Sequence, residues 1–255
     1  MVDDLMFQNR EHAGKELALL LEPKYKYLNP LVIGIPRGGV EVAYYVARQL
    51  EAELLLVISK KLPFPGRSEY GFGAVSEDHS VYISEQGKDG LSPEMINDIV
   101  EKQILEIQRR VEKYRQGKPL PDMEGRTVIL VDDGIATGVT LVPVIQLCKK
   151  KRAAKIVIAA PVSGTRFDKN LKEADEIEVL VQPQQFYAVG QVYETFEDFT
   201  DEELMQLLAK AKRELELKNN SNPLKQKGNE SAEEAQNKAD VAAELHIRSS
   251  KNREN

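Results

Sequence analysis

The 255-residue chain contains one cysteine, Cys148, and no tryptophan. A single cysteine excludes a disulfide within the chain and is typical of a reducing compartment, so a cytoplasmic protein is expected. No apolar run approaches the ~20 residues of a transmembrane helix, and the acidic start at Met1 to Asp4 does not have the pattern of a signal peptide. Cys148 falls in an expected helix, where a packed thiol is favoured over a nucleophile.

The chain also lacks a strong excess of positive charge. Its 35 Lys and Arg against 41 Asp and Glu give a net charge of −6, which provides no general attraction to nucleic acid. The basic cluster Lys149 to Lys155 lies at the end of an expected helix, where cations meet the negative pole of the dipole, so a structural role is favoured. Two nucleotide-binding loops are absent from the sequence as well, the P-loop and the G-x-G-x-x-G turn.

The stretch from Val128 to Thr140 joins an apolar run to a polar turn. Its first four residues predict a strand buried on both faces, and Asp132 and Asp133 follow directly. The turn of glycines and hydroxyls after them would present backbone N–H groups at a helix start, which suits a phosphate. Two carboxylates would repel a bare phosphate. They fit a ligand that also brings sugar hydroxyls or Mg²⁺, and a sugar phosphate has this character.

Apolar runs alternate with helical patterns, which predicts an α/β fold with a mostly parallel twisted sheet flanked by helices. Strands are expected at 31–35, 53–58, 128–131, 156–160 and 176–181, with two short strands within 72–83. Helices are expected at 11–21, 40–50 and 92–115, between the turn that ends at Thr140 and the basic cluster 149–155, and at 164–174 and 200–218. We expect the folded domain to span 1–218. Residues 219–255 are polar, contain few aliphatic side chains and predict a disordered or loosely helical tail, in which Ala232 to Leu245 could form a solvated helix.

Two further segments carry cations at strand ends. Pro36-Arg37-Gly38-Gly39 follows one strand and opens a helix, so it is a second potential anion site, although taken alone it could be a turn with a solvated arginine. The segment 59–71 contains Lys60, Lys61 and Arg67 and is too rich in proline and glycine for a regular element, so we expect a lid loop. His79 is expected at a hairpin tip as a turn residue.

Asp132 to Thr140 resembles the 5-phosphoribosyl-1-pyrophosphate (PRPP) signature of type I phosphoribosyltransferases, in which two acidic residues, three variable positions and Thr-Gly-x-Thr follow an apolar strand. The resemblance extends over about residues 5 to 215. Pro-Arg-Gly-Gly, Lys-Leu-x-x-Pro-Gly, Gly-Ala-Val and Phe-x-x-Val-Gly occur in the order seen in an uncharacterised prokaryotic group of predicted phosphoribosyltransferases.

This resemblance implies a site for PRPP and Mg²⁺ at the strand ends. Asp132 and Asp133 would hold the ribose hydroxyls and act in catalysis together with a lysine of the lid, Lys60 or Lys61. Mg²⁺ would be held mainly through PRPP, with Asp132 and Asp133 as the candidate protein ligands. The resemblance assigns the remaining contacts to PRPP to Arg37, Gly38, Gly39, Gly134, Ile135, Ala136, Thr137, Gly138 and Thr140. A hood at about 182–199 would cover the acceptor, with Phe186 stacked on it; Phe186 as plain core is the alternative.

Two positions depart from the pattern of enzymes that act on 6-oxopurines. Those enzymes have an aspartate just before Thr-Gly, where this chain has Ala136, and a lysine after the next strand, where Ala160 to Gly164 contains none. Alanine before Thr-Gly also occurs in adenine and orotate enzymes. The sequence therefore specifies the PRPP half of the site and leaves the acceptor open.

The function expected from the resemblance is Mg²⁺-dependent transfer of a phosphoribosyl group from PRPP to a nitrogenous acceptor, a nucleobase by expectation, with release of pyrophosphate. A PRPP-sensing regulator on the same fold and an enzyme that hydrolyses PRPP are the alternatives. Neither nucleic acid nor a membrane is an expected partner, and a homodimer is compatible with the sequence.

Overall fold

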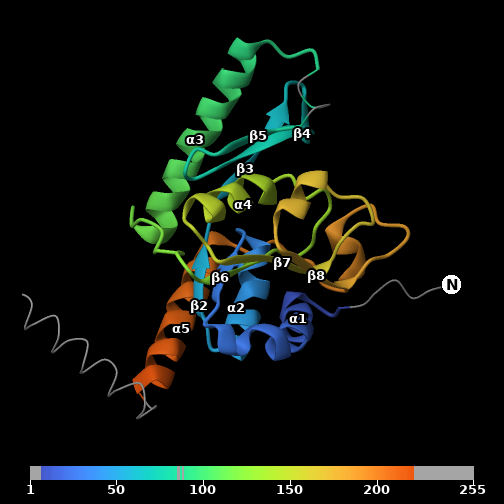
Figure 1. Cartoon of the computed structure of the whole chain (residues 1–255). Coiled ribbons are helices and arrows are strands. Elements are labelled where there is room, and N and C mark those ends of the chain that lie inside the picture. The colour runs from blue at the N-terminus through green and yellow to red at the C-terminus, as the bar shows by residue number, and fades with distance from the viewer. Residues whose placement is uncertain (1–6, 85–86, 88, 221–255) are drawn as a thin grey trace, which may run out of the picture. The chain divides into compact units, whose positions relative to one another are not determined.

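Five parallel strands form the central sheet, in the order β2-β1-β6-β7-β8 (Figure 1). The computed structural model describes residues 7–84, 87 and 89–220, without the side chains of 68–70. The strands are β1 Leu31–Gly34, β2 Glu53–Leu56, β6 Thr127–Val131, β7 Lys155–Val162 and β8 Glu176–Val181. The predicted α/β class, with a mostly parallel sheet flanked by helices, is confirmed.

Both faces of this sheet are covered. Side chains alternate along β6, so Val128 and Leu130 pack with helix α4 (Leu141–Lys150), while Ile129 and Val131 pack on the opposite face. That opposite face is covered by helices α1 (Arg10–Tyr25) and α2 (Gly38–Leu50). Every residue of β6 is buried, as its unbroken apolar run predicts.

A second, antiparallel sheet contains β3 (Ser59–Phe64), β4 (Arg67–Ser76) and β5 (Val81–Ile83). The prediction that 59–71 is too irregular for a strand was wrong. The pairing of β3 with β4 shifts register on both sides of Pro63, and Gly66 turns the chain with a φ of +74°, so the proline and glycine are accommodated. His79 lies in the next turn with a φ of +63°, as expected.

Two long helices begin at capped N-termini, and the first of them packs on this antiparallel sheet. Helix α3 (Pro93–Arg115) packs on it and begins at Ser92, whose hydroxyl accepts a hydrogen bond from the backbone N–H of Met95, as the sequence predicts. Helix α5 (Asp201–Asn220) begins at Thr200, where Thr200 and Glu203 form the expected reciprocal capping pair.

The helix predicted over 164–174 does not form. Only a short 3-10 turn, η2 (Lys169–Glu173), occurs there. The backbone N–H of Gly164 donates to the carbonyl of Ile135, and that of Asp168 donates to the carbonyl of Thr137. These bonds to the loop after β6 replace the ones that a helix would use. Two further 3-10 turns, η1 (Lys26–Leu28) and η3 (Val189–Val192), complete the regular elements of the described residues.

The chain divides into a compact unit, 1–212, and a second unit, 213–255, of which the structure describes only Arg213–Asn220, the end of α5. Residues 221–255 of the predicted tail therefore lie outside the described residues. Within the described ranges, no helix has both the length and the apolar character that crossing a lipid bilayer requires.

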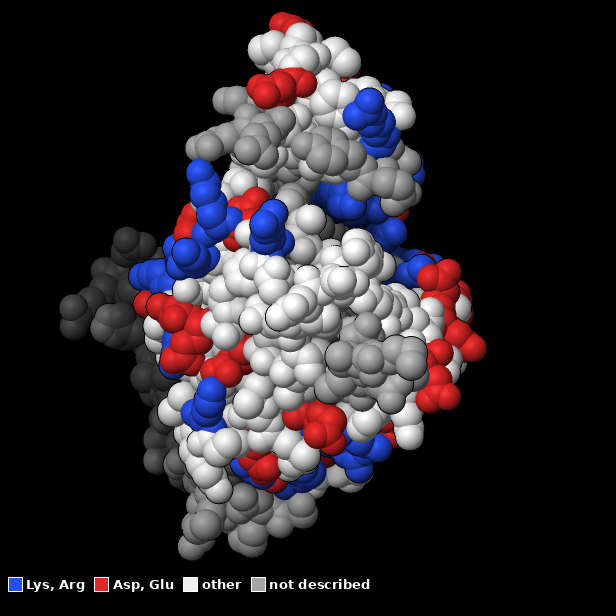
Figure 2. All heavy atoms as spheres, turned by 90° about the vertical axis from the view of Figure 1, so that its right-hand side faces the viewer, with Lys and Arg blue, Asp and Glu red and all other residues white. Residues whose placement is uncertain are grey.

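The basic cluster at the end of α4 is paired with carboxylates. Lys149 contacts Glu173, Lys150 contacts Asp78, Arg152 contacts Glu124 and Lys155 contacts Glu176, at N–O distances of 2.6–3.1 Å. On the face drawn in Figure 2, positive and negative side chains likewise alternate around an uncharged centre. Cys148 lies on the buried face of α4, and burial raises the pKa of its thiol to about 12, so it is the packed thiol predicted from the sequence.

Candidate active site

The strand order reverses between β1 and β6. From β1 the chain passes through α2 to β2 on one side, and from β6 it passes through α4 to β7 and β8 on the other side. In open α/β sheets, the crevice outside the carboxyl ends of two such strands is where ligands bind. The loop 36–39 follows β1 and the loop 132–140 follows β6.

These two loops are in direct contact. A Cβ added to Gly39 would lie 2.9 Å from the Cα and 2.9 Å from Oδ1 of Asp132, and one added to Gly38 would lie 2.0 Å from Oδ2 of Asp133. Only glycine allows this approach, because any side chain would collide with the acidic pair. The structure thus brings together three of the predicted groups, the glycine loop and both aspartates, from positions about a hundred residues apart in the sequence.

The turn after the aspartates combines structural and exposed residues. Ile135 is buried and both of its backbone groups bond to the β7 side, its N–H to the carbonyl of Val162 and its carbonyl to the N–H of Gly164. Ala136 and Thr137 are exposed. Gly138 has a φ of +72°, which returns the chain to the start of α4. Thr140 is the N-cap residue of α4, and within the described chain its hydroxyl makes no capping hydrogen bond.

The two carboxyl groups differ in environment. Oδ1 of Asp132 accepts a hydrogen bond from the backbone N–H of Asp133 at 2.9 Å. Burial, and then the charge of Asp133, raise the pKa of Asp132 well above its ordinary value. The hydroxyl of Tyr193 donates to the backbone carbonyl of Asp133 at 2.7 Å, and burial with the nearby carboxylate raises the pKa of Tyr193, so this donor stays protonated.

The raised pKa of Asp132 predicts how Asp132→Asn changes stability with pH. The unfolded carboxyl ionises near pH 3.9, whereas the folded one holds its proton to higher pH, so stability falls as the pH rises through this window. Asparagine does not ionise and its oxygen can still accept from the N–H of Asp133. We expect Asp132→Asn to melt at a higher temperature than wild type at pH 8 and to lose this advantage near pH 4, by thermal unfolding. Equal melting temperatures at pH 8 would contradict it.

Sequence reasoning missed Arg10, which binds the acidic pair directly. Its Nε donates to Oδ2 of Asp133 at 2.8 Å, and the arginine is buried with an exposed fraction of 9%. Arg10 is the first residue of α1, and a cation there faces the positive end of the helix dipole. That unfavourable position was a signal in the sequence that the arginine needs a carboxylate partner from elsewhere.

Arg37 faces carboxylates of a later segment of the chain. Its guanidinium lies 3.8 Å from Asp198 and 3.9 Å from Asp201, and its side chain is half-exposed. It stands one residue before Gly38, in the loop between β1 and α2.

The two lysines of β3 point to opposite faces of the antiparallel sheet. Lys60 faces α3, where burial and then the charge of Arg110 lower its pKa. Lys61 is exposed and pairs across the sheet with Ala74, which in turn pairs with Tyr82, so these three share a face. The hydroxyl of Tyr82 donates to Asp168, whose backbone bonds to the carbonyl of Thr137. The face of Lys61, and not that of Lys60, therefore looks toward the turn 134–140.

The segment 182–199 packs beside the same turn. A Cβ added to Gly134 would lie 2.4 Å from the side chain of Val189, so this glycine lets the segment approach closely. Phe186 is half-buried and its ring lies beside Gly164, next to the carbonyl of Ala136. The ring also packs against the buried cluster of Phe7, Ala13, Val162, Val192 and Tyr193, so Phe186 is part of a small core.

Comparison with known proteins agrees with this geometry. A curated Mycobacterium tuberculosis protein, described provisionally as a phosphoribosyl transferase, is 35% identical over 212 residues, which cover 82% of this chain and 48% of that protein. The chain thus spans about half the length of the curated relatives that it matches. The crystal structure of a Thermus thermophilus protein is 34% identical and superposes with a TM-score of 0.69, covering 81% of this chain and 99% of the other.

A family model for the phosphoribosyl transferase domain matches residues 5–194, a range that contains β1 to β8 and both loops of the crevice. With this match over most of the described chain, the protein belongs to the phosphoribosyl transferase family and has its type I fold.

Proposed function

We propose that the protein transfers a 5-phosphoribosyl group from PRPP to a nitrogenous acceptor, with a nucleobase as the expected acceptor class, and releases pyrophosphate. One observation carries the proposal: Asp132 and Asp133 meet the glycine loop of α2 at the point where the strand order reverses. This arrangement places two carboxylates between two loops that can each bind phosphate.

Each loop serves one end of PRPP in this proposal. The turn from Thr137 to Thr140 holds the 5-phosphate through backbone N–H groups and hydroxyls. Two observations support this role: Thr137 is exposed, and the hydroxyl of Thr140 makes no capping hydrogen bond within the described part of the chain. Asp132 and Asp133 accept hydrogen bonds from the ribose hydroxyls. Arg37, Gly38 and Gly39 hold the pyrophosphate, for which Arg37 must exchange its contacts with Asp198 and Asp201.

The donor set fits Mg²⁺ that arrives with the substrate. Among the described residues, no group of three or more His, Cys, Asp or Glu could form a metal cage. Mg²⁺ typically binds one or two carboxylates together with phosphate oxygens and water, and Asp132 and Asp133 can supply the carboxylates. When bound, Mg²⁺ offsets the negative charge that develops on the departing pyrophosphate.

The residues of the chain act on charge at C1 of the ribose. As the bond from C1 to the pyrophosphate oxygen breaks, positive charge grows on the ring, and the two carboxylates stabilise it. The acceptor nitrogen then forms its bond to C1 from the opposite face, and its proton passes to the departing pyrophosphate or to water. Phe186 provides an aromatic wall beside the turn on which a flat acceptor can stack.

The test combines PRPP with Mg²⁺ and a panel of bases while pyrophosphate is followed. Release that depends on one base supports transfer, and the active base identifies the acceptor. Release without any base would replace transfer by hydrolysis. Binding of PRPP by calorimetry without release would indicate a sensor, and the absence of any binding heat would contradict all three.

The opposite faces of Lys60 and Lys61 predict which lysine of β3 takes part. We expect Lys61→Ala to reduce PRPP turnover by at least about tenfold, the usual effect of losing one charge-assisted hydrogen bond. Lys60→Ala is the matched control, because it removes the same charge from the face of β3 that packs on α3 and should leave turnover within about twofold. An unchanged rate in both variants would remove this segment from the mechanism.

A further inference from the structure

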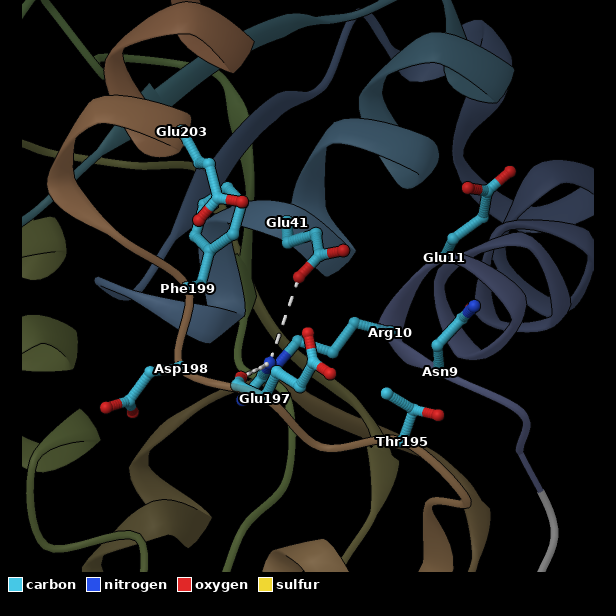
Figure 3. A pocket seen from close by; sticks show the side chains of 9 residues that line it. All are labelled: Asn9, Arg10, Glu11, Glu41, Thr195, Glu197, Asp198, Phe199 and Glu203. Atoms are coloured by element: carbon cyan, nitrogen blue, oxygen red, sulfur yellow. Dashed lines mark hydrogen bonds and ion pairs between the residues drawn. The ribbon is translucent and has the colours of Figure 1, made fainter.

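Arg10 joins the acidic pair to segments from both ends of the folded unit. Besides its bond to Asp133, its Nη1 donates to the backbone carbonyl of Glu197 at 2.7 Å and lies 3.9 Å from Glu41 of α2. Its guanidinium also lies over the ring of Phe196, with Cζ 4.0 Å from the ring centroid. Figure 3 shows Arg10 extending from α1 toward Glu41 on one side and Glu197 on the other. Four different contacts therefore fix one side chain.

The backbone on both sides of Arg10 is held as well. The N–H of Phe7 donates to the carbonyl of Val192, and the carbonyl of Phe7 accepts from the N–H of Glu194. Tyr193, in the middle of this pairing, donates its hydroxyl to the carbonyl of Asp133. At the start of α1 the side chain of Asn9 caps the helix by accepting from the N–H of His12. Arg10 thus stands on a rigid support that also touches the backbone of Asp133.

The groups around the carboxylate of Asp133 are mostly acidic. Asp132 adjoins it along the chain and Glu41 approaches from α2, while Tyr193 from the 182–199 segment is neutral. Arg10 is the cation bonded to it. Without that bond, the partly buried carboxylate of Asp133 would lack a compensating positive charge, which favours side-chain rotamers that reach water.

From these contacts we infer that Arg10 is a positioning residue: by binding Oδ2 it fixes the orientation in which Asp133 faces the crevice. This inference rests on the proposed function for its consequence in PRPP binding, although the orientation itself can be tested without PRPP. The fork of the guanidinium is required, because Nε serves Asp133 while Nη1 serves the carbonyl of Glu197. A lysine ammonium has a positive charge but cannot hold both partners in this geometry.

The first experiment uses no ligand. The folded protein is treated with a water-soluble carbodiimide and glycinamide, and the modification of Asp133 is followed by mass spectrometry. Asp133 should react about tenfold faster in Arg10→Met and in Arg10→Lys than in wild type, the factor expected for the loss of one charged hydrogen bond. Arg10→Lys keeps the experiment interpretable if Arg10→Met does not fold, which circular dichroism would reveal.

The matched control is Arg115→Met. Arg115 is also a partly buried arginine paired with a carboxylate, Glu77, at 2.7 Å, but it joins α3 to the β4–β5 turn. Labelling of Asp133 should stay at the wild-type rate in this variant. Equal rises in the Arg10 and Arg115 variants would show general loosening and overturn the inference. An unchanged rate of Asp133 labelling in Arg10→Met would also overturn the inference. A wild-type labelling rate in Arg10→Lys would do the same.

The second experiment measures binding of PRPP with Mg²⁺ by calorimetry. We expect both Arg10 variants to bind at least about tenfold more weakly than wild type, and Arg115→Met to bind normally. In the background of Asp133→Asn, the further change Arg10→Met should weaken binding much less, because the residue acts through Asp133. If labelling rises but PRPP affinity is unchanged, the orientation of Asp133 does not serve binding and the inference fails. If the wild type itself does not bind PRPP, the proposed function fails and the labelling still decides the role of Arg10.

Discussion

The double variant Asp132→Asn with Asp133→Asn should lose PRPP turnover by about 10³-fold or more while the protein remains folded. The removal of a single electrostatic contact to a developing charge typically reduces the rate by about 10²- to 10³-fold, and here two are removed together. Asparagine preserves the shape of each side chain, and its oxygen can still accept the hydrogen bond that Asp132 takes from the N–H of Asp133. Pyrophosphate release measures the first result, and circular dichroism with thermal unfolding measures the second.

The control for this variant removes two negative charges elsewhere. Asp122→Asn with Glu124→Gln changes exposed side chains in the turn before β6, where Glu124 pairs with Arg152. Turnover should remain at the wild-type level there. If the Asp132 and Asp133 double variant turned over PRPP normally, the acidic pair would not be the ribose site. If the double variant unfolded, the main role of the acidic pair would be to stabilise the fold.

Gly39→Ala should abolish PRPP binding and lower stability by about 1–3 kcal/mol, the usual cost of forcing an extra group into a packed space. The added Cβ would lie 2.9 Å from the Cα of Asp132 and 2.9 Å from the carbonyl oxygen of Val131. These are backbone atoms of the end of β6, and Val131 is held in register with Gly34 and Ala159 on both sides. The collision therefore cannot be relieved by a rotamer change, and the loop and the acidic pair must separate.

The comparison for Gly39→Ala is Gly90→Ala, where an added Cβ meets no atom within 4 Å. Gly90 has a φ of +83°, so alanine there costs roughly 1–2 kcal/mol in backbone conformation and lowers the melting temperature as well. PRPP affinity is the measurement that separates the two. It should be lost in Gly39→Ala and kept in Gly90→Ala, and normal affinity in Gly39→Ala would show that close contact between the loops is not needed.

Local signals in the sequence were sufficient for much of the fold. The apolar run Val128 to Val131 became the central strand β6, and the caps at Ser92 and Thr200 start α3 and α5 as predicted. The acidic pair and the glycine loop were found because each follows a buried strand and opens a helix. Signals of this kind depend on neighbours within a few residues, so they can be recognised without tertiary structure.

The errors arose where distant partners decide the conformation. Residues 59–71 form a hairpin because β3 pairs with β4 and packs on α3. No α-helix forms over 164–174, where the N–H groups of Gly164 and Asp168 bond to the carbonyls of Ile135 and Thr137 and only the 3-10 turn η2 remains. The same limit applies to the choice between Lys60 and Lys61, which neighbour each other in sequence but face opposite sides of a sheet. Propensity cannot show which face a later strand or helix will cover.

The sequence by itself determined the chemical groups of this protein: two carboxylates, a hydroxyl-rich turn and a glycine loop, each at the carboxyl end of a strand. The tertiary structure alone decided that these groups meet, because the strand order places β1 beside β6. It also supplied Arg10, which lies 123 residues from Asp133 along the chain and contacts it directly. A motif is local along the chain, whereas the electrostatic environment of a buried carboxylate depends on every segment that packs around it.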